Sequence, residues 1–163
     1  VRFRANIMSS QQTNPTIKIW AGEMDAVGSP DKYPIIATTY RVTEHWQAGQ
    51  MTRNNPWLVE LMPDMFVEMS KTLAKAKGIK HGDKVRVWNV RGAITAYAVV
   101  TDRFKPFNMN GKLYEHIGLP WHFGYSGLAK GCSANCLTPH VGDANTNIPE
   151  YKAFLCDVEK EVG

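Results

Sequence analysis

The sequence has no apolar run as long as the roughly 18 residues that a membrane-spanning helix needs. It also lacks a visible signal peptide, because Val1–Arg4 is followed by polar residues rather than by an apolar stretch. Its charges are scattered, with 19 Lys and Arg against 15 Asp and Glu and a net charge of +4. No polybasic run of the kind that binds nucleic acid occurs. We therefore predict no membrane insertion and no nucleic-acid partner.

Familiar catalytic and metal-binding motifs are also missing. No G-x-S-x-G, H-E-x-x-H, P-loop or G-x-G-x-x-G occurs, and the 5 His show no metal-ligand spacing. The 3 Cys contain no C-x2-C pair. A metal site or disulfide between Cys132 and Cys136 would rest on a C-x3-C spacing alone, so we predict packed or free thiols. The residues predict no catalytic residue and no metal ligand.

What is present is the composition of a globular domain, with 44% hydrophobic and 21% charged residues over 163 positions. β-branched runs predict strands over 34–40, 85–90, 93–100 and 153–158, the middle two forming a hairpin. Met69, Leu73 and Ala76 have helical spacing, with Ser70 as N-cap and Gly78 just past the end. Residues 47–55 and the chain from Asn108 to the last strand are expected to be mostly loop. We predict a mainly β fold with small helices, a closed β-barrel, in which 1–32 is a lead-in linker and 33–163 the barrel domain.

Three clusters of polar residues suggest ligand binding. The cluster from Thr38 to His45 has hydroxyls, a guanidinium and an imidazole beside a strand end, which suits a phosphate. An equal alternative is a surface ion pair between Glu44 and Arg41. The segment around Trp121 and His122 fits a ligand contact or a packed, hydrogen-bonded core histidine. The stretch 143–152 offers amides for a purine edge, an aromatic ring and a lysine, or simply a turn rich in Asn and Asp before Pro149. The residues alone therefore indicate an anionic, ring-containing ligand.

Seven segments between about Tyr33 and Val158 follow one another in a recognisable order: Thr38–His45, Gly78–Ile79, Gly82–Val87, Arg91–Gly92, Gly118–Gly124, Leu137–Pro139 and Gly142–Lys152. In this order they resemble the C-terminal dinucleotide-binding domain of molybdenum or tungsten formate dehydrogenase catalytic subunits. The resemblance implies a double-psi β-barrel of the aspartate-decarboxylase-like type. It also implies binding of two molybdopterin guanine dinucleotides that carry Mo or W, in a parent enzyme that oxidises formate to carbon dioxide.

By the same resemblance, the cofactor contacts would come from four places in the chain. The implied cofactor-binding residues are Thr39, Arg41, Thr43, His45, Gln47, His122, Asn135, Asn145, Tyr151 and Lys152. The metal ligand and the residues for a 4Fe-4S cluster would lie in other domains, so this chain alone would not turn over formate. The implied partners are the remaining domains of the catalytic subunit and an iron–sulfur electron-transfer subunit. The implied compartment is the periplasm, with the cytoplasm as the alternative.

An interpretation from another functional class also fits the residues. The barrel would then be a stand-alone subunit or an interaction module of a related molybdopterin oxidoreductase. A longer reading frame upstream of Val1 would separate the two readings, because a fragment needs one and a separate subunit does not.

Overall fold

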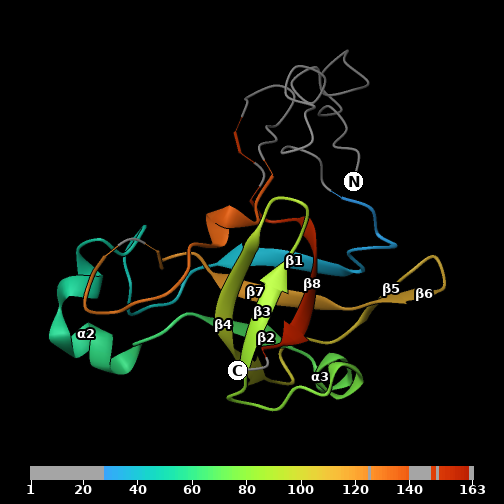
Figure 1. The fold of residues 1–163 in the computed structure, drawn as a ribbon, viewed down its shortest axis with the longest axis horizontal. Helices are drawn as coiled ribbons and strands as arrows, with labels where there is room; N and C mark the ends of the chain where they lie inside the picture. Colours follow the sequence, from blue (N-terminus) through green and yellow to red (C-terminus); the bar gives the residue numbers. More distant parts are fainter. Residues whose placement is uncertain (1–27, 125, 140–147, 150, 162–163) are drawn as a thin grey trace.

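Six strands form a closed, mixed barrel in the computed structural model, which describes residues 28–124, 126–139, 148–149 and 151–161 (Figure 1). The strand order around the barrel is β1-β7-β2-β4-β3-β8. β1 is parallel to β7 and β2 is parallel to β4, whereas the other neighbouring strands are antiparallel. The strands are β1 (Ile35–Tyr40), β2 (Phe66–Met69), β3 (Lys84–Trp88), β4 (Ala93–Val100), β7 (His116–Pro120) and β8 (Phe154–Lys160). The predicted closed β-barrel is confirmed.

Alternating side chains of the strands fill the inside of the barrel. In β1, every second residue from Ile35 is buried, and β3 and β4 show the same alternation. This period of two sends successive side chains to opposite faces, as in β3, where Val85 and Val87 are buried and Lys84 and Arg86 are exposed. The most deeply buried apolar residues are Ala37, Val67, Met69, Val85, Val87, Ile117, Leu119, Ala134, Leu137, Cys156 and Val158.

The short helix α3 (Lys71–Lys77) was predicted correctly, together with both of its caps. The Ser70 hydroxyl accepts a hydrogen bond from the Leu73 amide, and Gly78 adopts the left-handed conformation with φ 65°. Its expected buried face was partly wrong. Met69 is the last residue of β2, and Ala76 is exposed while Ala74 is buried. The residues at helical spacing therefore included the last residue of a strand, because β2 and α3 are separated by the N-cap residue alone.

Several elements lie where the sequence predicted loop or nothing. These are η2 (Thr52–Asn54), α2 (Pro56–Leu61), β2, the hairpin β5 (Phe107–Met109) and β6 (Lys112–Tyr114), β7, and η3 (Ala134–Cys136). β7 was missed because Gly118 and Pro120 are common in turns. Here Gly118 allows a close approach instead, since an added Cβ would lie 2.3 Å from Phe104 and 2.5 Å from Tyr40.

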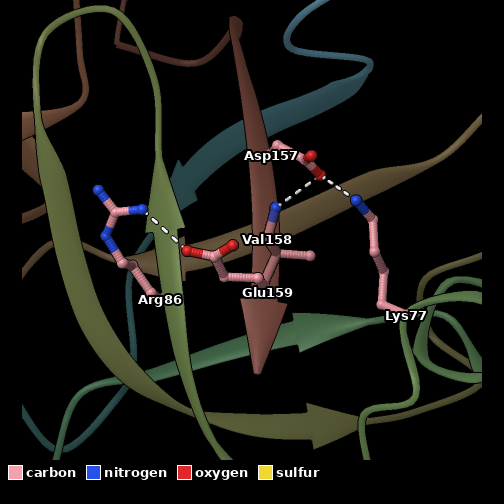
Figure 2. A network of polar contacts seen from close by, with 5 residues as sticks. All are labelled: Lys77, Arg86, Asp157, Val158 and Glu159. Atoms are coloured by element: carbon pink, nitrogen blue, oxygen red, sulfur yellow. Dashed lines mark hydrogen bonds and ion pairs between the residues drawn. The ribbon is translucent and has the colours of Figure 1, made fainter. Parts of the chain in front are cut away.

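The outer face of β3 and β8 carries a row of ion pairs. Figure 2 shows Lys77 bound to Asp157 at 2.5 Å and Arg86 bound to Glu159 at 2.9 Å. Asp157 also accepts a hydrogen bond from the Val158 amide. Alternate residues of β8 thus meet cations from α3 and β3. We call this surface the β3–β8 face, defined by the three pairs Lys77–Asp157, Arg86–Glu159 and Lys84–Glu161.

No described helix is both long and apolar enough to cross a membrane. Most of the predicted linker, residues 1–27, lies outside the described residues, so the boundary between 1–32 and 33–163 stays a prediction.

Candidate functional site

Five of the predicted site residues line one pocket of about 200 Å³ at an end of the barrel. The pocket is lined by Thr39, Arg41, Trp121, Asn135, Tyr151 and Lys152. Trp121 is the one lining residue that was not among the predicted contacts, although its segment was singled out.

The barrel topology explains why residues so distant in sequence meet there. β1 and β7 are parallel, with Tyr40 opposite Pro120, so Arg41 and Trp121 leave the barrel side by side. β8 runs antiparallel to β1, with Phe154 opposite Ala37. The residues just before β8 therefore lie beside the end of β1. The sequence could not reveal these pairings, because they depend on the closure of the barrel.

Two hydrogen bonds fix the segment before β8 on the end of β1. The Thr39 hydroxyl donates to the Tyr151 carbonyl at 2.9 Å. The Lys152 ammonium donates to the Thr39 carbonyl at 2.5 Å. Thr39 thereby fixes both the backbone of this segment and the position of the lysine nitrogen.

The pocket has two cations near each other. The Arg41 guanidinium lies over the Trp121 ring, 5.5 Å from its centroid. Burial lowers the pKa of Lys152, and repulsion from Arg41 lowers it further. Among the described residues, neither cation forms a salt bridge. An anion bound between them would relieve this repulsion.

This donor set fits a phosphate-bearing group that contains a ring. A guanidinium and an ammonium bind phosphate oxygens, and the Asn135 amide offers both a donor and an acceptor. The Trp121 and Tyr151 rings offer flat apolar surfaces to a planar group. The residues present therefore suit a dinucleotide tail.

The two predicted histidines are buried and hydrogen-bonded within the chain. The His122 Nε2 atom accepts a hydrogen bond from the Val42 amide at 2.9 Å, so the ring proton is on Nδ1, which donates to the Gln47 carbonyl. His45 Nε2 donates to the Met62 carbonyl at 2.9 Å. Burial lowers the pKa of His122, partly offset by the hydrogen bond to Gln47. Both imidazoles thus hold the shape of the segment that follows Arg41, and their direct contact with a cofactor stays a prediction.

The other predicted residues lie apart from this pocket. Thr43 lines a neighbouring pocket of about 400 Å³, and Gln47 is exposed with φ 51°. Asn145 lies outside the described residues.

The neighbouring pocket contains a buried carboxylate that the sequence analysis did not single out. The Glu68 carboxylate accepts a hydrogen bond from the Tyr40 hydroxyl and pairs with Arg103 at 2.8 Å. Burial and the contact with Glu68 raise the pKa of Tyr40 well above its usual range. No sequence signal identifies this network, because its three members come from separate elements and share no motif.

The described cysteines are free thiols, with Cys156 buried and Cys136 exposed. No group of three or more His, Cys, Asp or Glu in the described part of the chain could hold a metal ion.

Known proteins share both the sequence and the fold. The family model described as "Molydopterin dinucleotide binding domain" matches residues 35–155. Formate dehydrogenase subunit alpha of Megalodesulfovibrio gigas is 54% identical over 148 residues, which are 90% of this chain and 14% of that protein. The nitrate-inducible formate dehydrogenase major subunit of Escherichia coli is 47% identical over 149 residues, which are 91% of this chain and 14% of that protein.

Among solved structures, acetylene hydratase from Pelobacter acetylenicus shares the fold, with a TM-score of 0.63 at 15% identity. The match covers 81% of this chain and 19% of that one. The predicted fold class, a mainly β double-psi barrel with small helices, is confirmed by the closed six-stranded barrel and by this likeness. The chain spans 14% of the length of the two formate dehydrogenase subunits named above. By its sequence match and its barrel, this chain belongs to the molybdopterin dinucleotide binding domain family.

Proposed function

We propose that this chain is the cofactor-binding domain of a formate dehydrogenase catalytic subunit. The observation that carries the proposal is the pocket at the end of β1, where Arg41 and Lys152 stand together without a carboxylate partner among the described residues. Identities of 54% and 47% to formate dehydrogenase subunits supply the substrate class.

In this function, the residues of the pocket hold the dinucleotide tail. Arg41 and Lys152 would bind phosphate oxygens through charge-assisted hydrogen bonds. Tyr151 and Trp121 pack against the flat ring of the nucleotide, while Asn135 hydrogen-bonds to its polar edge. Thr39 sets the position of Lys152, and His122 sets the course of the backbone after Arg41.

The bound group, two molybdopterin guanine dinucleotides with Mo or W, supplies the two-electron chemistry that converts formate to carbon dioxide. This chain contributes binding, orientation and exclusion of water. The metal ligand and the 4Fe-4S cluster belong to the remaining domains of the subunit, and electrons leave through an iron–sulfur subunit. The compartment proposed is the periplasm, with the cytoplasm as the alternative, and fractionation of cells that express the full-length protein tests it.

The alternative function is a stand-alone barrel subunit or interaction module of a related molybdopterin oxidoreductase. One measurement on the untruncated native protein separates the two: its intact mass, its Mo and W content, and the guanine released by acid. A mass several times that of the 163-residue chain, with one metal for two guanines, supports the proposal. A native mass near that of this chain, with neither metal nor guanine, refutes it.

A further inference from the structure

Large apolar side chains are concentrated and exposed around one short helix. Trp57 and Leu61 of α2 are 80% and 68% exposed, and no residue of this helix is buried. They are four positions apart, which places them on the same side of the helix. A six-residue helix gains little stability alone, and packing of an apolar side normally stabilises it. Within this domain, Val59 of α2 packs against the core, whereas the side of the helix that carries Trp57 and Leu61 has no such packing.

Three further exposed apolar residues lie on the segments around α2. The Trp46 amide donates to the Thr52 hydroxyl at 3.0 Å, and Met51 directly precedes η2. The Leu128 amide donates to the Arg53 carbonyl at 2.9 Å, which brings the loop after β7 against η2 (Figure 1). We call this surface the α2 patch, defined by Trp46, Met51, Trp57, Leu61 and Leu128, all of them more than half exposed.

The composition of the α2 patch is that of a buried interface. Trp, Met and aromatic residues are enriched at interface centres, whereas single exposed apolar residues are ordinary. Gathered apolar side chains on a surface indicate a binding partner.

The α2 patch is also continuous in sequence with the pocket. The segment that begins at Arg41 leads to Trp46, and the segment that begins at Trp121 leads to Leu128. The pocket and the patch therefore occupy the same end of the barrel. A protein body seated on the patch would also stand beside the bound dinucleotide.

We infer that the α2 patch is the surface on which another domain of the same catalytic subunit packs, through an apolar surface of its own. This inference rests on the proposed function. The occupant follows from length, since the matched formate dehydrogenase subunits have 86% of their polypeptide outside the matched region, given the 14% that this chain covers. Contact with that polypeptide is available whenever the subunit is folded, whereas a second copy or a separate subunit depends on concentration.

Oxidative footprinting of the purified full-length catalytic subunit, without other subunits, tests the inference. Met51 and Trp57 are expected to be modified about tenfold more slowly than in the urea-unfolded subunit, because an interface centre excludes water. Modification at near the unfolded rate overturns it. Protection that disappears on dilution indicates a second copy, and protection that appears only after the electron-transfer subunit is added indicates that subunit; either result overturns it.

A pair of matched variants gives a second test in the full-length subunit. Leu61 and Leu113 are 68% and 66% exposed in this domain, but Leu113 lies on the β5–β6 hairpin, outside the α2 patch. Leu61→Asp is expected to lower the thermal midpoint by several degrees and Leu113→Asp to leave it unchanged. An unchanged midpoint in Leu61→Asp, or an equal loss in both variants, overturns the inference.

Guanine content measured on the same samples keeps this inference separate from the proposed function. A subunit that contains guanine but exposes Met51 refutes the interface alone. A subunit that protects Met51 but contains no guanine refutes the proposed function and leaves the interface in place.

Discussion

The β3–β8 face and the pocket end of the barrel treat their charges in opposite ways. On the β3–β8 face, each cation lies within 3.0 Å of a carboxylate (Figure 2). At the pocket end, Arg41 and Lys152 lie near each other, and the described residues provide no carboxylate for either. The charges of the β3–β8 face are already paired with one another, whereas the pocket end is suited to bind an anion and an apolar partner. Under the proposed function, unpaired charge rather than the amount of charge distinguishes the binding surface from the rest of the barrel.

The largest expected effect is a difference in the free energy of unfolding lost when either of two ion pairs of nearly equal length is removed. Arg103–Glu68 measures 2.8 Å and Arg86–Glu159 measures 2.9 Å, but the Glu68 side chain is 8% exposed and that of Glu159 is 52% exposed. Glu68→Ala leaves the buried Tyr40 hydroxyl without its acceptor and is expected to cost about 3 kcal/mol. Glu159→Ala is expected to cost less than about 1 kcal/mol. Urea unfolding of the 163-residue chain measures both, and equal costs would remove the distinction between the buried and the exposed ion pair.

The second prediction compares two arginines in cofactor retention. Arg41→Ala removes a charge-assisted phosphate contact of roughly 1.5–3 kcal/mol, so the full-length enzyme is expected to hold its dinucleotide about ten- to a hundredfold less tightly. Arg86→Ala, on the β3–β8 face, is the control and is expected to retain the cofactor fully. Guanine and metal content after prolonged dialysis give the readout. Retention unchanged in Arg41→Ala would contradict the assignment of the pocket.

A smaller effect is expected from a pair of tyrosines. Tyr151 and Tyr97 are 43% and 44% exposed, but only Tyr151 lines the pocket with Arg41. Tyr151→Ala is expected to weaken dinucleotide binding by about 1 kcal/mol, which is typical of a lost aromatic contact. Tyr97→Ala is expected to leave binding unchanged. The same dialysis assay applies, and equal retention by both variants would exclude a role for the Tyr151 ring.

The smallest expected effect is a pH dependence from His122. Because burial holds its pKa below the usual 6.5, the folded chain favours the neutral ring, whose Nε2 accepts from the Val42 amide. The unfolded chain then binds more protons as the pH falls below 6.5, so this contribution to stability is complete above that pH and is lost below it. Urea midpoints at a series of pH values measure the loss. His122→Gln should flatten the profile, whereas a change at the exposed His81 should not.

The sequence predicted those parts of the fold whose cause is local. The strand 35–40 and the 84–100 hairpin follow from β-branched alternation, and α3 follows from its caps. The strand β7 could not be found in this way, because Gly118 is required by contacts with Phe104 and Tyr40 that exist only after the barrel closes.

The candidate site could likewise be predicted only in part, since the sequence suggests residue types but not their tertiary contacts. Residue chemistry and the family resemblance suggested Thr39, Arg41, Asn135, Tyr151 and Lys152, and the structure brings these five together. His45 and His122 were predicted with them, and their contact with a cofactor stays a prediction, since neither lines this pocket. Their hydrogen bonds to backbone atoms of distant segments are set by tertiary packing.

The hydrogen bond between Lys152 and Thr39 joins residues that are 113 positions apart. During synthesis, the ribosome therefore makes Arg41 long before it makes the lysine that completes the pocket or the strand β8 that closes the barrel. Under the proposed function, dinucleotide insertion into this pocket would follow translation of nearly the whole domain. A polypeptide that terminates before β8 lacks the finished pocket, so under the proposed function only completed chains of the domain would bind the cofactor there.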